Sequence, residues 1–197
     1  MGFEDTFAAA IMGQGFGKER FLVSYKDRPH ISKSKLDRYS EALYIGTGEL
    51  SRLKFSEIRQ RYIAAMDVTY DLMLTIYDVN TSTLLAARLF GFPDKTAKEI
   101  DSFVRDLGKK ANLEARLIGL QNNESTDSLS RIFAFLKSRK IQLVEIDVFG
   151  NEIRHIAVDS KIGVPYNILK DNRIYRPGEL TNTATIEQFE KGIRKTP

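Results

Sequence analysis

Residues 66–93 read M-D-V-T-Y-D-L-M-L-T-I-Y-D-V-N-T-S-T-L-L-A-A-R-L-F-G-F-P, and this stretch decides the fold class. Two runs of bulky apolar and β-branched residues, Leu72–Tyr77 and Leu84–Phe90, are separated by turn-forming residues such as Asn80 and Ser82. This pattern predicts a β-hairpin with a loop of about four to six residues. Because both runs are almost continuously apolar, we expect the hairpin in the middle of the domain, with both faces covered.

The rest of the chain is long enough for one domain with a full core, since it has 197 residues, of which 42% are hydrophobic. We expect a basic, partly flexible extension over residues 1–40, an α/β domain over 41–180 and a C-terminal helix over 181–197. The first residues include Glu4 and Asp5 where a signal peptide needs basic residues, and no apolar run approaches the roughly 20 residues that cross a bilayer. A cytoplasmic protein without a transmembrane segment is therefore expected.

Positive charge is concentrated near the N-terminus. The segment from Lys18 to Arg38 holds seven basic and three acidic residues, an excess that equals the chain's net charge of +4. It is either a solvated arm or a docking segment for an acidic partner or a membrane surface. A nucleic-acid partner is not expected, because only this arm and a few aromatic residues such as Tyr25 and Tyr39 favour it.

Helices and strands alternate after the hairpin. Apolar stripes predict a helix that begins near Asp94 and a second that begins at Thr126 or Asp127. Alternating or apolar runs predict further strands over Leu113–Leu120, Ile141–Val148 and Ile153–Val158. Upstream of the hairpin, the three- and four-residue spacing of apolar residues from Leu53 to Met66 favours an amphipathic helix or a loop with helical turns.

Candidate chemistry is limited by composition. The chain has no cysteine, so thiolate metal sites and thiol nucleophiles are excluded. His30 and His155, the two histidines, lack ligand spacing, and we expect neither a metal nor a cofactor. Glu145 and Asp147 lie on one face of their predicted strand. This suits either the paired carboxylates of a hydrolase or charges on a solvated face.

The order of elements, with Leu72–Asp78, Ala115–Gly119, Phe135–Lys137 and the Gly150-Asn151 turn, resembles the pattern of CheD, the chemoreceptor glutamine deamidase, over roughly residues 44–170. The resemblance implies a layered α/β/β sandwich of mixed and antiparallel strands with two packed helices. The family's nucleophilic cysteine falls on Asp71, its histidine on Arg88 and its threonine on Ala65. All three catalytic residue types are therefore replaced.

These replacements imply a CheD-like protein without deamidase activity, because a carboxylate is a poor nucleophile toward an amide and a guanidinium keeps its proton. Such a protein would bind a chemoreceptor or a CheC-like phosphatase as a regulator or scaffold. The residues expected to contact that partner are Tyr70, Arg88, Phe149 and Asn151.

Two further expectations concern the replaced residues themselves and an alternative function. Asp71 and Arg88 are expected to form an ion pair where the family has a thiolate and an imidazolium, although they can equally be two unrelated exposed charges. The alternative function is a hydrolase of another kind, with Asp71, Glu145 or Asp147 as acid or base in a cleft.

Overall fold

The computed structural model describes residues 28–38, 41–57, 59–120, 126–148 and 153–169 of the 197. In this part of the chain, three helices and ten strands occur in the order β1 (His30–Ser32), α2 (Lys33–Arg38), β2 (Ala42–Tyr44), β3 (Leu50–Lys54), β4 (Tyr62–Val68), β5 (Leu72–Asp78), β6 (Thr83–Leu89), α3 (Asp94–Leu107), β7 (Leu113–Gly119), α4 (Thr126–Ser138), β8 (Gln142–Val148), β9 (Arg154–Asp159) and β10 (Pro165–Leu169).

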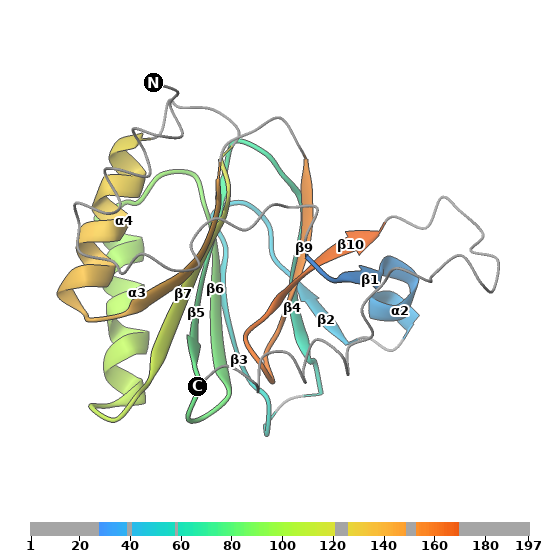
Figure 1. Ribbon diagram of the computed structural model, residues 1–197, viewed down its shortest axis with the longest axis horizontal. Helices are drawn as coiled ribbons and strands as arrows, with labels where there is room; N and C mark the ends of the chain where they lie inside the picture. The colour runs from blue at the N-terminus through green and yellow to red at the C-terminus, as the bar shows by residue number, and fades with distance from the viewer. Residues whose placement is uncertain (1–27, 39–40, 58, 121–125, 149–152, 170–197) are drawn as a thin grey trace.

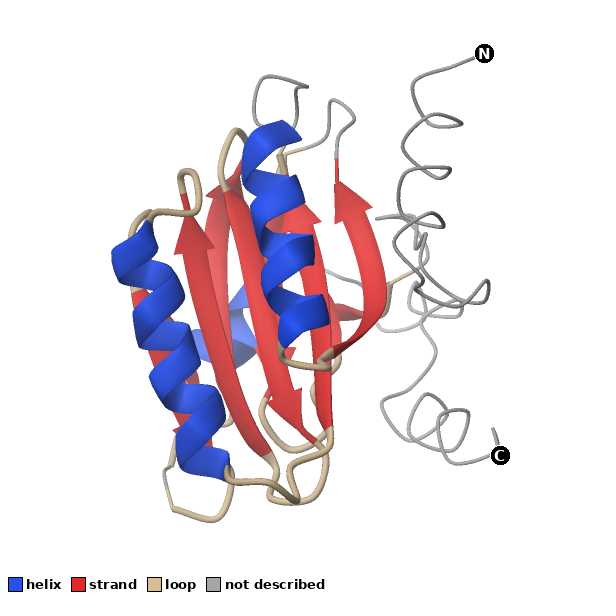
Figure 2. Cartoon of the chain, turned by 90° about the vertical axis from the view of Figure 1, so that its left-hand side faces the viewer, coloured by secondary structure: helices blue, strands red, loops and turns tan. Residues whose placement is uncertain are grey.

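The strands form two sheets of five, stacked face to face (Figure 1). The first, with strand order β3-β6-β5-β7-β8, is covered on one face by α3 and α4 and is called the helix-covered sheet here (Figure 2). The second, with order β1-β10-β9-β4-β2, is called the outer sheet and packs against its other face. Parallel and antiparallel pairs occur in both sheets. The molecule is therefore a mixed α/β sandwich, as expected from the order of elements.

The predicted hairpin is confirmed as β5 and β6, joined by the four residues 79–82. β5 lies between β6 and β7 at the centre of its sheet, and all seven of its residues are buried. The buried Asp78 carboxylate organises the loop, because it accepts hydrogen bonds from the Asn80 backbone N–H at 3.2 Å and the Thr81 hydroxyl at 2.6 Å. The Asp78 side chain thus supplies hydrogen-bond acceptors for loop residues whose backbone turns away from the neighbouring strand.

Side-chain alternation along β5 divides the core into two layers. Leu72, Leu74 and Ile76 point toward α3 and α4, whereas Met73 and Tyr77 point toward the outer sheet. Both faces of the strand are therefore covered, which is why it reads as a continuous apolar run rather than as an alternating one.

The stretch from Leu53 to Met66, expected as an amphipathic helix or a loop with helical turns, is not a helix, because it contains the end of β3 and most of β4. The described residues between these strands, 55–57 and 59–61, belong to neither a helix nor a strand. β4 places Ile63 and Ala65 between the sheets and Tyr62 and Ala64 on the opposite face, where they pack in a third apolar cluster. A strand with both faces buried has apolar residues at almost every position, so a helical spacing can be picked out of it by chance.

Part of the expected N-terminal extension belongs to the folded domain. β1 pairs in parallel with β10, and Leu36 of α2 is fully buried against the outer sheet. Residues 1–27 and the expected C-terminal helix lie outside the described residues.

Among the described residues, no helix has both the length and the apolar character that crossing a membrane requires.

Candidate functional site

Asp71 and Arg88, which the resemblance places at the nucleophile and base positions, lie side by side at one end of the sandwich. Asp71 immediately precedes β5, and Arg88 is the next-to-last residue of β6. The Arg88 Nε–H donates to Asp71 Oδ2, and the two side chains are only 12% and 5% exposed. The expected ion pair is therefore present, and it is mostly buried.

Asp71 is held by more than its arginine. Its Oδ2 also accepts the Thr47 hydroxyl at 2.7 Å, and its Oδ1 accepts the Thr69 backbone N–H at 3.1 Å. Burial raises the pKa of Asp71, but the hydrogen bonds from Arg88 and Thr47 outweigh that effect, so this pKa lies below its ordinary value. The carboxylate consequently stays ionised at neutral pH.

Arg88 links the two sheets through an irregularity in β4. The pairing of β4 with β9 shifts register between Ala65 and Val68, and Asp67 within the shift has a left-handed φ of 53°. Arg88 Nη1 donates to the Met66 carbonyl at 2.7 Å, and Nη2 donates to the Asp67 carbonyl at 2.9 Å. All three guanidinium nitrogens thus donate to groups of the protein itself.

His155 completes the support of this bulge. Its Nδ1 accepts the Asp67 backbone N–H at 3.0 Å, so that ring nitrogen carries no proton in the contact. Ala65, at the threonine position of the resemblance, is fully buried between the sheets and offers only a methyl group for packing. Asp71 and Arg88 are therefore bound to each other, and Arg88 also to the β4 bulge, whereas Ala65 is part of the apolar core between the sheets.

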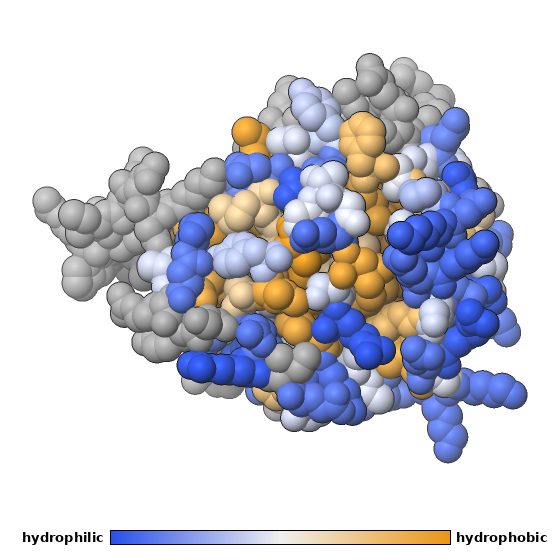
Figure 3. Space-filling model, turned by 180° about the vertical axis from the view of Figure 1, so that it is seen from behind, coloured by the Kyte–Doolittle hydropathy of each residue, from blue (hydrophilic) through white to orange (hydrophobic). Residues whose placement is uncertain are grey.

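Among the described residues, three large hydrophobic side chains are exposed at this same end, where β5 and β9 begin and β6, β7 and β8 finish, the upper end in Figure 1. Tyr70 is 58% exposed, Phe90 75% and Ile153 51%, the highest values among the exposed large hydrophobic residues that the structure describes. We call these three residues the apolar rim. Other apolar surface also exists, since hydrophobic side chains gather across the middle of the face seen in Figure 3, between hydrophilic flanks.

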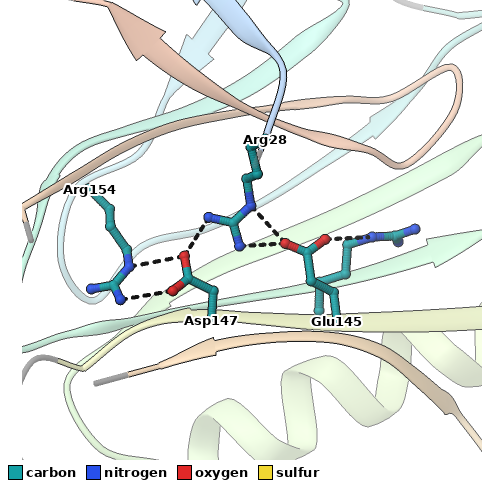
Figure 4. Close-up of polar contacts among 5 residues, drawn as sticks. Arg28, Glu145, Asp147 and Arg154 are labelled. Atoms are coloured by element: carbon teal, nitrogen blue, oxygen red, sulfur yellow. Dashed lines mark hydrogen bonds and ion pairs between the residues drawn. The ribbon is translucent and has the colours of Figure 1, made fainter. Parts of the chain in front are cut away.

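Glu145 and Asp147 lie elsewhere, on the face of β8 that points toward the outer sheet. Both are 7% exposed, so the interpretation as charges on a solvated face is wrong. Figure 4 shows Arg28 between the two carboxylates, with Arg154 on the other side of Asp147. Arg28 Nε donates to Glu145 at 2.7 Å, and its Nη1 donates to Asp147.

Two further arginines complete this group, which we call the ionic cluster. Arg154 of β9 donates to Asp147 through Nε at 3.1 Å and Nη2 at 2.8 Å. Arg116 of β7 donates through Nη2 to Glu114 at 2.9 Å, while its Nε lies 3.6 Å from Glu145 Oε2. The carboxylates are thus neutralised by arginines from three segments of the chain, as buried charges require.

Sequence reasoning missed Thr47 and all three arginines of the ionic cluster. Arg116 carries one available signal, because it is a charged residue between the apolar residues Ala115 and Leu117 of β7, at an inward-facing position. Arg154 begins β9 beside His155, in a strand that also holds Asp159, and carries no such signal. Arg28 also carries no sequence signal of burial, since it lies in a basic segment that resembles a solvated arm.

Of the residues expected to contact a partner, the Tyr70 side chain is exposed, whereas the Arg88 side chain is mostly buried and paired with Asp71. Phe149 and Asn151 lie outside the described residues. Within the described ranges, no three or more histidine, aspartate or glutamate side chains are grouped so that they could hold a metal ion.

A scan against models of protein families found no match for this chain, and a search of curated proteins found none either. The similarity to CheD consequently stays a prediction that rests on the order and spacing of residues in the sequence.

Proposed function

We propose that this chain is a catalytically inactive, CheD-like regulatory or scaffold protein that binds a signalling partner, either a chemoreceptor or a CheC-like phosphatase. The observation that supports this proposal is the buried Asp71–Arg88 pair. If the resemblance holds, an ion pair occupies the two positions that the chemistry needs, and neither member can act as a thiol nucleophile or exchange a proton near neutral pH.

The contacts of the three candidate carboxylates give the hydrolase alternative little support. Asp71 has a lowered pKa, which is the wrong direction for a general acid at neutral pH. Glu145 and Asp147 accept hydrogen bonds from arginines inside the sandwich and are almost fully buried. A catalytic carboxylate pair needs room between its members for water or substrate, whereas Arg28 lies between these two.

The binding surface in this proposal is the apolar rim around the pair. Exposed aromatic side chains are common anchors at protein interfaces, because they bury a large area at little cost in conformational entropy. Tyr70 directly precedes Asp71, and Phe90 follows Arg88 by two residues. The ion pair would then fix the two segments that present these aromatic residues.

Direct binding measurements with purified proteins test the proposal. We expect the full-length chain to bind the cytoplasmic region of a chemoreceptor or a CheC-like phosphatase, and Phe90→Ala to weaken that binding by about tenfold or more, as truncation of an interface anchor does. Phe55→Ala is the matched control. Phe55 is also exposed, but it lies beside the hairpin loop at the opposite end, where its N–H donates to the Ser82 carbonyl.

Equal losses for the two phenylalanine variants would argue against the apolar rim as the binding surface. Failure to bind either class of partner would count against the chemotaxis assignment. Release of ammonia from glutamine side chains of a chemoreceptor by the cysteine-free chain would contradict the absence of deamidase activity.

A further inference from the structure

The loop of the β5–β6 hairpin lies at the end of the sandwich opposite the apolar rim, the lower end in Figure 1. The loop between α3 and β7 is held beside it, because the Val79 N–H donates to the Asn112 carbonyl at 2.9 Å and Asn80 Nδ2 donates to the Lys110 carbonyl at 2.7 Å. The segment that carries the exposed Lys109 and Lys110 therefore lies next to Val79, which is 41% exposed.

The turn between β9 and β10 lies on the other side of the hairpin loop. The Ser82 hydroxyl donates to the Lys161 carbonyl at 3.3 Å, and the Phe55 N–H donates to the Ser82 carbonyl at 3.1 Å. The Lys161 ammonium lies 5.8 Å from the centre of the Phe55 ring, and Phe55 is 39% exposed. Two exposed apolar side chains and three exposed lysines thus gather at one end of the sandwich. We call this set the hairpin-loop face: Phe55, Val79, Lys109, Lys110 and Lys161.

The three lysines of the hairpin-loop face carry positive charge that no ion pair offsets. Within the part of the chain that the structure describes, none of them lies within ion-pair distance of a carboxylate. Even with the fully buried Asp78 counted against the three lysines, the face stays positive. The other carboxylates nearby have basic partners of their own: Glu57 pairs with Lys54, Asp106 with Arg52 and Glu114 with Arg116.

This combination of residue types favours a lipid surface over other acidic partners. Lysine is a strongly hydrated point charge on a flexible stem, which suits a diffuse negative surface, whereas arginine is the usual choice for recognising nucleic-acid phosphates. An apolar side chain among the lysines is stabilised when it leaves water for the boundary between headgroups and acyl chains. Phe55 and Val79 are placed for this, because they lie on neighbouring loops among the three lysines.

We propose that the hairpin-loop face binds the protein reversibly to an anionic lipid bilayer, with its lysines at the headgroups and Phe55 and Val79 in the interface. The apolar rim, at the opposite end of the sandwich, then stays accessible. The proposal does not depend on the function proposed above.

Co-sedimentation of the full-length protein with vesicles is the first test. At an ionic strength of about 0.1 M, we expect binding to phosphatidylcholine vesicles that contain about 30% phosphatidylserine, and little binding to phosphatidylcholine alone. Lys109→Gln combined with Lys110→Gln should weaken binding about 25-fold, because each lysine near an anionic surface contributes about fivefold.

The matched control is Lys95→Gln combined with Lys98→Gln, which removes the same charge from exposed positions in the first half of α3. It should change vesicle binding by less than about twofold, because these positions face away from the bound bilayer and their charge is screened. Equal losses for the two double variants would overturn the proposal, and so would equal binding to both kinds of vesicle. Binding to double-stranded DNA at an ionic strength that releases the vesicles would also overturn it, in favour of a nucleic-acid partner.

A tryptophan reporter tests whether the apolar residues enter the bilayer. The chain has no tryptophan, so a substituted one supplies all of the tryptophan emission. In Val79→Trp, we expect the emission to move to shorter wavelength on the anionic vesicles, and lipids with brominated acyl chains to quench it. Tyr70→Trp, in the apolar rim, is the control and should keep its spectrum. Unchanged emission of Val79→Trp on vesicles that bind the protein, or a shift in Tyr70→Trp alone, would overturn the proposal.

Discussion

At the scale of single residues, the pair formed by Asp71 and Arg88 shows how two charges can be part of a protein's framework. The carboxylate accepts from Arg88, Thr47 and the Thr69 backbone, and the guanidinium also donates to two carbonyls of the β4 bulge. Removing one partner leaves the other buried without compensation, which costs more than the pair itself contributes. The two residues should therefore behave as one unit.

A double-mutant cycle measures this coupling. We expect Asp71→Ala and Arg88→Met each to lower the free energy of unfolding by about 3 to 5 kcal/mol, because each strands a buried charge. The double variant should lose about 1 to 3 kcal/mol less than the sum of the single losses. Urea unfolding of the four proteins gives these values.

The exposed pair of Arg131 and Asp94, with side chains 53% and 83% exposed, is the control. Its coupling should stay below about 0.5 kcal/mol, as is usual for surface ion pairs. Strictly additive losses for Asp71 and Arg88 would show that the two side chains do not interact in solution.

Acid titration of stability tests the lowered pKa of Asp71. Because this pKa lies below its ordinary value, the unfolded chain takes up the proton at a higher pH than the folded protein does. The stability that the carboxylate contributes is thus complete above the ordinary pKa of about 4 and is lost as the pH falls through the lowered folded value.

Asp71→Asn should therefore be less stable than the parent chain at pH 7, yet lose less free energy of unfolding between about pH 5 and pH 2.5. Asp106→Asn, at a side chain that is 63% exposed, should follow the parent curve closely. An acid-induced loss of stability as steep in Asp71→Asn as in the parent chain would show that this carboxylate does not titrate as inferred.

At the scale of elements, Gly119 lets the end of β7 approach the start of β5. Its φ is 121°, and a Cβ at this position would lie 2.5 Å from the Asp71 carbonyl oxygen and 2.7 Å from Val68 Cγ1. The Leu120 N–H donates to the same Asp71 carbonyl at 2.9 Å. A side chain at residue 119 would push β7 away from the segment that carries the Asp71 carboxylate.

We expect Gly119→Ala to lower the free energy of unfolding by about 3 kcal/mol, from the strained φ together with the steric overlap. Gly48→Ala is a matched control, because Gly48 also has a left-handed φ, of 84°, but nothing lies within 4 Å of the point that an added methyl group would occupy. That variant should lose about 1 kcal/mol, from backbone strain alone. Denaturant unfolding of both variants checks the difference, and equal losses would rule out the overlap.

At the scale of the whole molecule, the N-terminal segment joins the sandwich through Arg28, Ile31 and Leu36. Arg28 reaches Glu145 and Asp147, which lie 117 and 119 residues away in sequence. Ile31 and Leu36 are buried against the outer sheet. The boundary of the folded domain therefore falls before β1 rather than at residue 40.

Truncation tests this boundary. A chain that begins at Glu41 should have a free energy of unfolding at least about 3 kcal/mol lower than one that begins at Arg28, because it lacks the arginine between two buried carboxylates. Arg28→Met in the longer chain separates that ionic contribution from the packing of β1 and α2. Equal stability of the two truncated chains, measured by urea unfolding, would mean that residues 28–38 are dispensable for folding.

The sequence alone determined the parts of this protein that depend on local pattern. The β5–β6 hairpin, helices α3 and α4 and strand β8 follow from apolar periodicity and turn residues, which act over a few neighbouring positions. The pairing of Asp71 with Arg88 could also be predicted from the sequence, because both residues flank or belong to the strands of one short hairpin. The helix offered as one alternative for Leu53 to Met66 is wrong for the residues of β3 and β4, since local spacing cannot distinguish a strand buried on both faces from a helix.

Only the tertiary structure decided what covers each face. The alternation in β8 places Glu145 and Asp147 on one side of the strand, but whether that side meets water or Arg28, Arg116 and Arg154 depends on segments distant in sequence. From the sequence, a carboxylate on a buried, arginine-lined face cannot be distinguished from one on a solvated face. The physical reason is that burial and ion pairing are properties of assembled sheets, whereas periodicity is a property of single elements.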